Sequence, residues 1–333
     1  MKTTRRDFMK TATAATAGLA VLGNYMAAAD TVEAVQSAKY KTKLYKAMIG
    51  DAPSDELCEK LIAAGFEGLE VTGWDIPVAE AQKKRQIAEK HGIRIHSIMR
   101  GWAQFNDTNK ENAQKTIEQT KTAIRTAAAY GAETILLVPC RTGGMPMPEA
   151  WDFDIDFDPK TLEVKSVAQG DNSKYEEYIK VQNYSTEATI EAMSELIPVA
   201  AKEGVIIAIE NVWNNLWSDP KYAAALVHYF DNPWVKAYFD LGNHTKYSKP
   251  QLWIQAYGHS MVKLHIKGYK ITKELGTKGG GEGDWCPTDQ SSTDWKEVRK
   301  LLDQVNYNGW ITVEEGNYDY AKYSQILDDF ING

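Results

Sequence analysis

The segment that decides the fold is "GVIIAIENVW" (204–213), in which a glycine precedes five apolar residues and a charged residue, Glu210, follows them. Continuous apolar runs of this kind are typical of strands that are buried on both faces of a parallel sheet. Seven similar runs occur along the chain: "KLYKAMIG" (43–50), "GFEGLEVTGW" (65–74), "GIRIHSIMRGW" (92–102), "GAETILLVPC" (131–140), "VKAYFDLGNH" (235–244), "MVKLHIKGYK" (261–270) and "GWITVEEG" (309–316).

Segments with helical spacing of apolar residues separate these runs. One of them, "SDELCEKLIAAG" (54–65), begins at Ser54, an expected N-cap, and ends at Gly65, an expected C-cap. Eight strand–helix alternations predict one (β/α)8 TIM barrel over residues 30–333. The alternative is an open doubly wound sheet, which would place a glycine-rich turn after the first strand. The segment there, "MIGDAPSDE" (48–56), is a poor match for such a turn.

Two connections in this barrel stand out. The segment after the fourth strand, at about 141–184, is long, polar and rich in turns, so we expect a βα loop over the barrel mouth that shapes the substrate site. Its "DFDIDFD" (152–158) favours a solvated strand or hairpin over a calcium loop. The glycine-rich "GTKGGGEGDW" (276–285) follows the seventh strand and is expected to be a flexible loop.

The last four apolar runs each meet an ionisable residue at or near their carboxyl ends: Glu210, Asp240, His265 and Glu314. Taken singly, each has an ordinary explanation as an ion-pair partner, a helix cap, a core histidine or a rim charge. In a barrel, however, all four would converge on one mouth, where three carboxylates repel one another. One divalent cation resolves this repulsion, and oxygen ligands with one nitrogen suit Mn²⁺, Mg²⁺, Co²⁺ or Zn²⁺.

The motifs "AIENVW", "AYFDLGNH", "VKLHIKGY", "GGGEGDW" and "NGWITVEEG" resemble those of the xylose-isomerase-like barrels, whose members include sugar phosphate isomerases and epimerases. The resemblance covers most of the chain after the first 29 residues. It implies that Glu210, Asp240, His265 and Glu314 bind one divalent metal, and that His244 touches metal or substrate. The acid that usually follows "HIK" in that family is Gly268 here. The resemblance also implies a homodimer.

Such a site favours removal of a proton next to a sugar carbonyl, with Glu210 and Glu314 as the acid/base pair. Proton return gives epimerisation or aldose–ketose isomerisation, whereas loss of a β leaving group makes the enzyme a lyase or hydrolase of 3-keto-glycosides. The other strand ends are expected to contact the carbohydrate. These substrate-binding candidates are Glu70, Trp74, His96, Trp102, Arg141, Trp213 and Lys267, together with His244.

Near its start the chain carries "TRRDFMK" (4–10), which is followed by a weakly apolar stretch that ends at Ala29. This pattern predicts a twin-arginine signal peptide over residues 1–29 and export to the periplasm. Cleavage would take the net charge from −7 to −10, which argues against nucleic-acid partners and against membrane binding after cleavage. Export also favours an unphosphorylated sugar, because sugar phosphates belong mainly to the cytoplasm.

The same barrel hosts DNA-repair endonucleases, but these use several zinc ions and a basic face. The six histidines and the acidic charge of this chain argue against that function. A non-catalytic sugar-binding protein is a third alternative, which the complete set of metal ligands disfavours.

Overall fold

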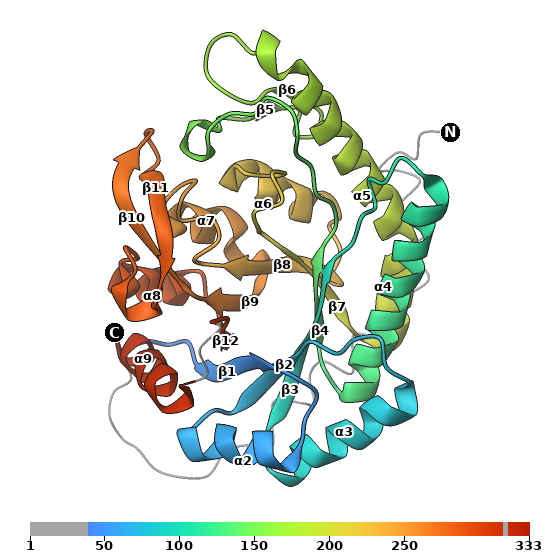
Figure 1. Ribbon diagram of the computed structural model, residues 1–333, viewed down its shortest axis with the longest axis vertical. Helices are drawn as coiled ribbons and strands as arrows, with labels where there is room; N and C mark the ends of the chain where they lie inside the picture. The colour runs from blue at the N-terminus through green and yellow to red at the C-terminus, as the bar shows by residue number, and fades with distance from the viewer. Residues whose placement is uncertain (1–38, 316–318) are drawn as a thin grey trace.

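The computed structural model describes residues 39–315 and 319–333. The signal peptide predicted for residues 1–29 lies outside these residues. Within them, eight parallel strands form a closed barrel in the spatial order β1-β12-β9-β8-β7-β4-β3-β2 (Figure 1). The strands are β1 (Leu44–Gly50), β2 (Gly68–Val71), β3 (Arg94–Trp102), β4 (Thr134–Val138), β7 (Ile206–Glu210), β8 (Val235–Asp240), β9 (Met261–Ile266) and β12 (Gly309–Val313). The predicted TIM barrel is therefore confirmed.

A helix follows each barrel strand and covers the outside of the barrel (Figure 1). The helices are α2 (Asp55–Ala64), α3 (Val78–Lys90), α4 (Lys110–Tyr130), α5 (Glu176–Glu203), α6 (Pro220–Tyr229), α7 (Pro250–Tyr257), α8 (Trp295–Gln304) and α9 (Tyr320–Asn332). The predicted caps of α2 are confirmed: the Ser54 hydroxyl accepts from the backbone N–H of Leu57, and Gly65 adopts φ 84° at the C-cap. Among the described helices, none has the length and apolar character that a membrane-spanning segment requires.

Apolar side chains pack on both faces of the barrel strands, as continuous apolar runs require. The larger cluster lies between strands and helices and includes Ile135, Leu137 and Ile207. The smaller cluster, with Leu136, Ala208 and Tyr238, lies inside the barrel. Near the amino ends of the strands, the Trp310 ring approaches Gly68 so closely that a Cβ there would lie 2.3 Å from it. The opposite, carboxyl ends remain available for a site.

The long connection after β4 differs in detail from the expected loop. It contains the predicted hairpin as a short antiparallel pair, β5 (Asp156–Phe157) and β6 (Val164–Ser166), but α5 begins at Glu176, well before Tyr184. The pair is held to α5, because Asn183 accepts from the backbone N–H of Val164 at 2.7 Å and donates to its carbonyl at 3.1 Å. This connection arches over the top of the barrel in Figure 1.

The glycine-rich segment after β9 was predicted to be a flexible loop, and this prediction was wrong. It forms a two-stranded antiparallel hairpin of β10 (Gly268–Leu275) and β11 (Gly280–Cys286), which projects beside the mouth in Figure 1. The glycines are required by close packing, since a Cβ on Gly281 would lie 2.1 Å from the carbonyl of Lys273. Pairing between the two backbones orders the hairpin, although its glycines have no side chains that could pack.

Candidate metal centre

The four ionisable residues at the strand ends meet at the carboxyl end of the barrel. Glu210 ends β7, Asp240 ends β8, His265 lies one residue before the end of β9, and Glu314 directly follows β12. Register brings them together, because Asp240 pairs with His265 and His265 pairs with Thr312. One ligand atom from each residue lies within 4.8 Å of the others. This juxtaposition is the one that the strand-end pattern predicted.

The imidazole of His265 stands at the centre of this cluster. Its Nδ1 lies 3.2 Å from Glu314 Oε2, 3.5 Å from Glu210 Oε1 and 3.7 Å from Asp240 Oδ2. Nδ1 and Asp240 Oδ2 are both buried, and neither makes a hydrogen bond among the described residues, although Asp240 Oδ2 lies 3.2 Å from the Lys267 ammonium. The convergence of a ring nitrogen and a carboxylate oxygen at one buried point fits a bound cation that both would coordinate.

The electrostatics of the cluster point the same way. Burial raises the pKa of Asp240 to about 7 and also raises the pKa of Glu210. Burial alone would lower the pKa of His265, but the charges of Glu70 and Glu314 raise it well above its ordinary value. The buried carboxylates thus draw positive charge to this point, and a divalent ion would supply it in place of the imidazole proton.

Lys267 supplies part of that charge. Its Nζ lies 2.7 Å from Glu314 Oε2 and 3.2 Å from Asp240 Oδ2. Burial opposes ionisation of Glu314, but the charges of His265 and Lys267 hold the pKa of Glu314 below its ordinary value. Lys267, predicted to contact substrate, therefore also pairs with two of the expected metal ligands.

Glu70 was predicted to contact substrate, but the structure places it behind His265. It is fully buried at the end of β2, and its Oε2 lies 2.6 Å from His265 Nε2. A carboxylate on the far nitrogen fixes the tautomer in which the other nitrogen faces the ion. Glu70 would thus position His265 for a metal ion bound by this cluster.

Two asparagines that sequence reasoning missed hold the acidic residues in place. The Asn211 side chain accepts from the backbone N–H of Asp240 at 2.8 Å and donates to its carbonyl at 3.0 Å. The Asn243 backbone N–H donates to Asp240 Oδ1 at 2.6 Å, and its side chain donates to Glu210 Oε1 at 3.3 Å. Their only sequence signal is their position, directly after Glu210 and three residues after Asp240.

Two predicted substrate contacts, His96 and His244, are almost fully buried. His244 accepts from the Asn211 side chain and packs against Trp253 of α7, with ring centroids 4.2 Å apart. His96 lies in the middle of β3, stacks on Trp310 at 4.8 Å and lies 3.2 Å from Thr312 Oγ1. The pKa of each histidine is lowered well below its ordinary value by burial. Both are neutral core residues in this structure.

The remaining predicted contacts lie on two sides of the mouth. On one side the guanidinium of Arg141 lies 5.2 Å from the ring of Trp102, which is 45% exposed. Trp74 follows shortly after the end of β2, and the Arg100 guanidinium carbon lies 4.5 Å from the centroid of its ring. On the other side Trp213 stacks on Trp285 of the β10–β11 hairpin at 4.7 Å.

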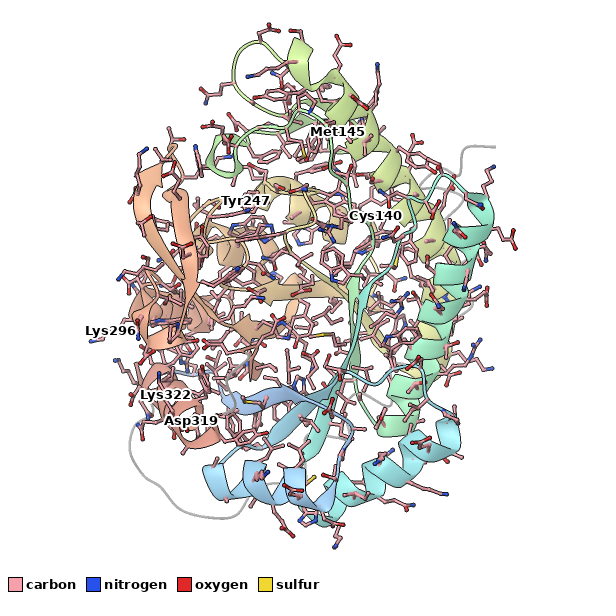
Figure 2. The ribbon with its side chains drawn as sticks, viewed as in Figure 1. Cys140, Met145, Tyr247, Lys296, Asp319 and Lys322 are labelled. Carbon is pink, nitrogen blue, oxygen red and sulfur yellow. The ribbon has the colours of Figure 1, made fainter. Side chains whose placement is uncertain are left out.

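A cavity of about 460 Å³ opens beside the metal centre, and we call it the outer cavity. None of the four expected metal ligands lines it. Its walls come from the long connection after β4, the segments after β7 and β8, and the β10–β11 hairpin. Tyr247, one of the lining residues, is labelled in Figure 2. The lining residues are 147–151, 153, 213, 215, 246, 247, 269 and 281–283. The connection after β4 therefore helps to form the mouth, as expected from its position.

A parallel eight-stranded barrel with this ligand set at its carboxyl ends defines a TIM barrel that is suited to binding a divalent metal. Residues 58–329 match the family described as xylose isomerase-like TIM barrel, and the chain belongs to this family. The resemblance inferred from the motifs is confirmed at that level.

Relatives of the chain are sugar epimerases. L-ribulose-5-phosphate 3-epimerase UlaE of Escherichia coli O1:K1 is 29% identical over 144 residues, covering 42% of this chain and 47% of the relative. The chain thus matches about half the length of its curated relatives. Among solved structures, a D-tagatose 3-epimerase-like protein has a TM-score of 0.64 at 16% identity, covering 86% of this chain and 97% of that one. The 3-keto-D-glucoside 4-epimerase YcjR of E. coli has a TM-score of 0.60 at 14% identity, covering 86% and 99%. At these identities the two structures establish the shared fold.

Proposed function

We propose that this protein is a divalent-metal-dependent epimerase or isomerase of an unphosphorylated sugar or keto-sugar. The observation that carries the proposal is the buried His265 Nδ1, which has no hydrogen-bond partner within 39–315 and 319–333 and faces Glu210, Asp240 and Glu314. The epimerase relatives and the family support the reaction class. A bound ion would supply Lewis-acid polarisation of a sugar carbonyl and its neighbouring hydroxyl.

The protein's own residues would carry the proton. Glu210 and Glu314 come from different strands and reach the cluster from separate directions, so one can take the proton next to the carbonyl and the other can return it. Lys267 holds Glu314 at 2.7 Å, and Asn243 holds Glu210 at 3.3 Å. These contacts fix the two carboxylates before substrate arrives, which lowers the cost of reaching the reactive geometry.

The charge of the outer cavity supports an unphosphorylated substrate. One lysine, Lys246, and two carboxylates, Glu149 and Glu282, line it, and its lining contains no arginine. A phosphate dianion would meet net negative charge there. Export by the twin-arginine pathway, which we propose from residues 1–29, points to the same substrate class. The homodimer remains a prediction.

A second candidate is a lyase or hydrolase of 3-keto-glycosides that uses the same proton removal. The outer cavity favours it, because about 460 Å³ of space beside the ligands gives room for a group attached to the reacting sugar. The two functions differ in product: an epimerase or isomerase returns the whole molecule, whereas the lyase or hydrolase releases the aglycone.

The proposal is tested by incubating Mn²⁺-loaded protein with ketohexoses and with a 3-keto-glucoside in D₂O. We expect deuterium at the carbon next to the carbonyl, loss of exchange after chelation, and loss in Glu314→Gln by about 100-fold or more. Glu118→Gln, a change at an exposed carboxylate on α4, is the matched control. Absence of metal-dependent exchange with every substrate would refute the proposal, and aglycone release without epimer formation would select the second candidate.

A further inference from the structure

We propose that the outer cavity binds the second sugar ring of a two-ring substrate, so that the enzyme acts on a disaccharide or its keto derivative. The identity of the reacting ring rests on the proposed function. The assignment of the second ring rests on the size, the connection and the chemistry of the cavity.

The cavity is large enough to hold a ligand group in addition to the one that reacts at the metal centre. Its volume of about 460 Å³ falls within the range of about 300–1,000 Å³ that is typical of sites for drug-sized ligands. Glu210, Asp240, His265 and Glu314 do not line it. A monosaccharide whose reacting carbon lies at these residues would leave the cavity to water, whereas a second ring would fill it.

One tryptophan connects the cavity to the metal centre. Trp213 lines the cavity, and its indole N–H donates to the carbonyl of Asn243, whose amide donates to Glu210 Oε1 at 3.3 Å. On its other side Trp213 stacks on Trp285, and the Trp285 ring lies 5.2 Å from Lys267 Nζ. Trp213 is therefore connected to Glu210 through Asn243 and to Lys267 through Trp285, which is 47% exposed. A two-ring ligand could pass over this pair of tryptophans.

The lining favours a ring that carries hydroxyls. Trp151 and Tyr269 offer aromatic surfaces to sugar C–H groups, whereas the Trp213 ring is packed against Trp285 at 4.7 Å and against Lys246 Nζ at 3.6 Å. Glu149 and Glu282 can accept hydrogen bonds from hydroxyls. A flat apolar aglycone offers these carboxylates no hydrogen-bond donor, whereas a sugar hydroxyl does. A neutral second sugar satisfies both kinds of lining.

The cavity is already formed in the protein alone. Lys278, in the turn between β10 and β11, donates to the carbonyl of Phe153 at 2.8 Å and to Asp219 Oδ2 at 2.6 Å. Gly276 approaches the long connection closely, since a Cβ there would lie 2.5 Å from the carbonyl of Trp151. The hairpin and the long connection are thus joined across the cavity, so little ordering remains for binding.

The test is calorimetric titration of the Mn²⁺-loaded full chain with maltose, cellobiose, lactose, trehalose, D-glucose and phenyl β-D-glucoside. We expect at least one disaccharide to bind about tenfold or more tighter than both D-glucose and the phenyl glucoside, equivalent to ~1.4 kcal/mol or more. Trp151→Ala and, as a milder change, Glu282→Gln should each reduce this preference. Tyr184→Ala, at another exposed aromatic residue, should preserve it.

Equal affinities across the panel, tightest binding of the phenyl glucoside, or a preference that survives both cavity variants would overturn the proposal. These outcomes are distinguishable from failure of the proposed function. Disaccharide preference without any proton exchange would refute the epimerase or isomerase while leaving the cavity assignment standing. Proton exchange on monosaccharides without a disaccharide preference would support the epimerase or isomerase and refute the cavity assignment.

Discussion

Glu70 is expected to control metal affinity without being a ligand. Its carboxylate lies 2.6 Å from His265 Nε2, and both side chains are fully buried. Loss of such an outer partner typically lowers metal affinity by about 10–100-fold, or ~1.4–2.8 kcal/mol. Glu70→Gln keeps an oxygen that can accept from Nε2 but removes the charge, so we expect a loss near about tenfold. Glu70→Ala leaves Nε2 without a partner, and we expect a loss near about 100-fold.

The assay is competition for Mn²⁺ against a fluorescent chelator at fixed pH, with the thermal unfolding of each metal-free variant measured beside it. Glu133→Gln is the matched control. Glu133 also pairs with a side chain of β9, but its partner is Lys263, near the amino end of the strand, at 3.2 Å. This variant should change stability and leave Mn²⁺ affinity unaltered. If Glu70→Gln binds Mn²⁺ as tightly as the unchanged protein, the contact of Glu70 with Nε2 does not orient His265 for coordination through Nδ1.

Three further predictions concern stability and order. Adding Mn²⁺ to metal-free protein at about 100 times its Kd should raise the unfolding free energy by ~2.7 kcal/mol, measured by urea denaturation; no change would argue against binding to the native state. Gly68→Ala should lower the unfolding free energy by about 1–3 kcal/mol, because its Cβ would lie 2.3 Å from the Trp310 ring, and an unchanged urea midpoint would contradict this packing. Lys278→Met should lower the unfolding free energy by about 1–3 kcal/mol, because Asp219 Oδ2 loses its partner at 2.6 Å. It should also speed amide exchange in 147–153 and 276–281, and slow exchange in both segments would show that Lys278 does not join them.

The strand-end rule found the cluster of expected metal ligands because it depends on chain direction alone. Every parallel barrel strand delivers its last residues to the same rim, so Glu210, Asp240 and Glu314 could be grouped before any contact was known. The same rule assigned Glu70 to the substrate, since it also ends a strand. Whether a strand-end side chain faces the mouth or a neighbouring residue is set by its contacts, and Glu70 meets His265, 195 positions later in the chain.

The sequence by itself determined the barrel and its set of expected ligands, because apolar periodicity and the position of charges along each strand are local properties. The tertiary structure decided the rest: His96 and His244 in the core, the hairpin in place of a flexible loop, and a cavity bounded by four separate connections. These features depend on which side chains meet once the sheet closes. Packing and backbone pairing between distant segments fix those contacts, and no local pattern records them.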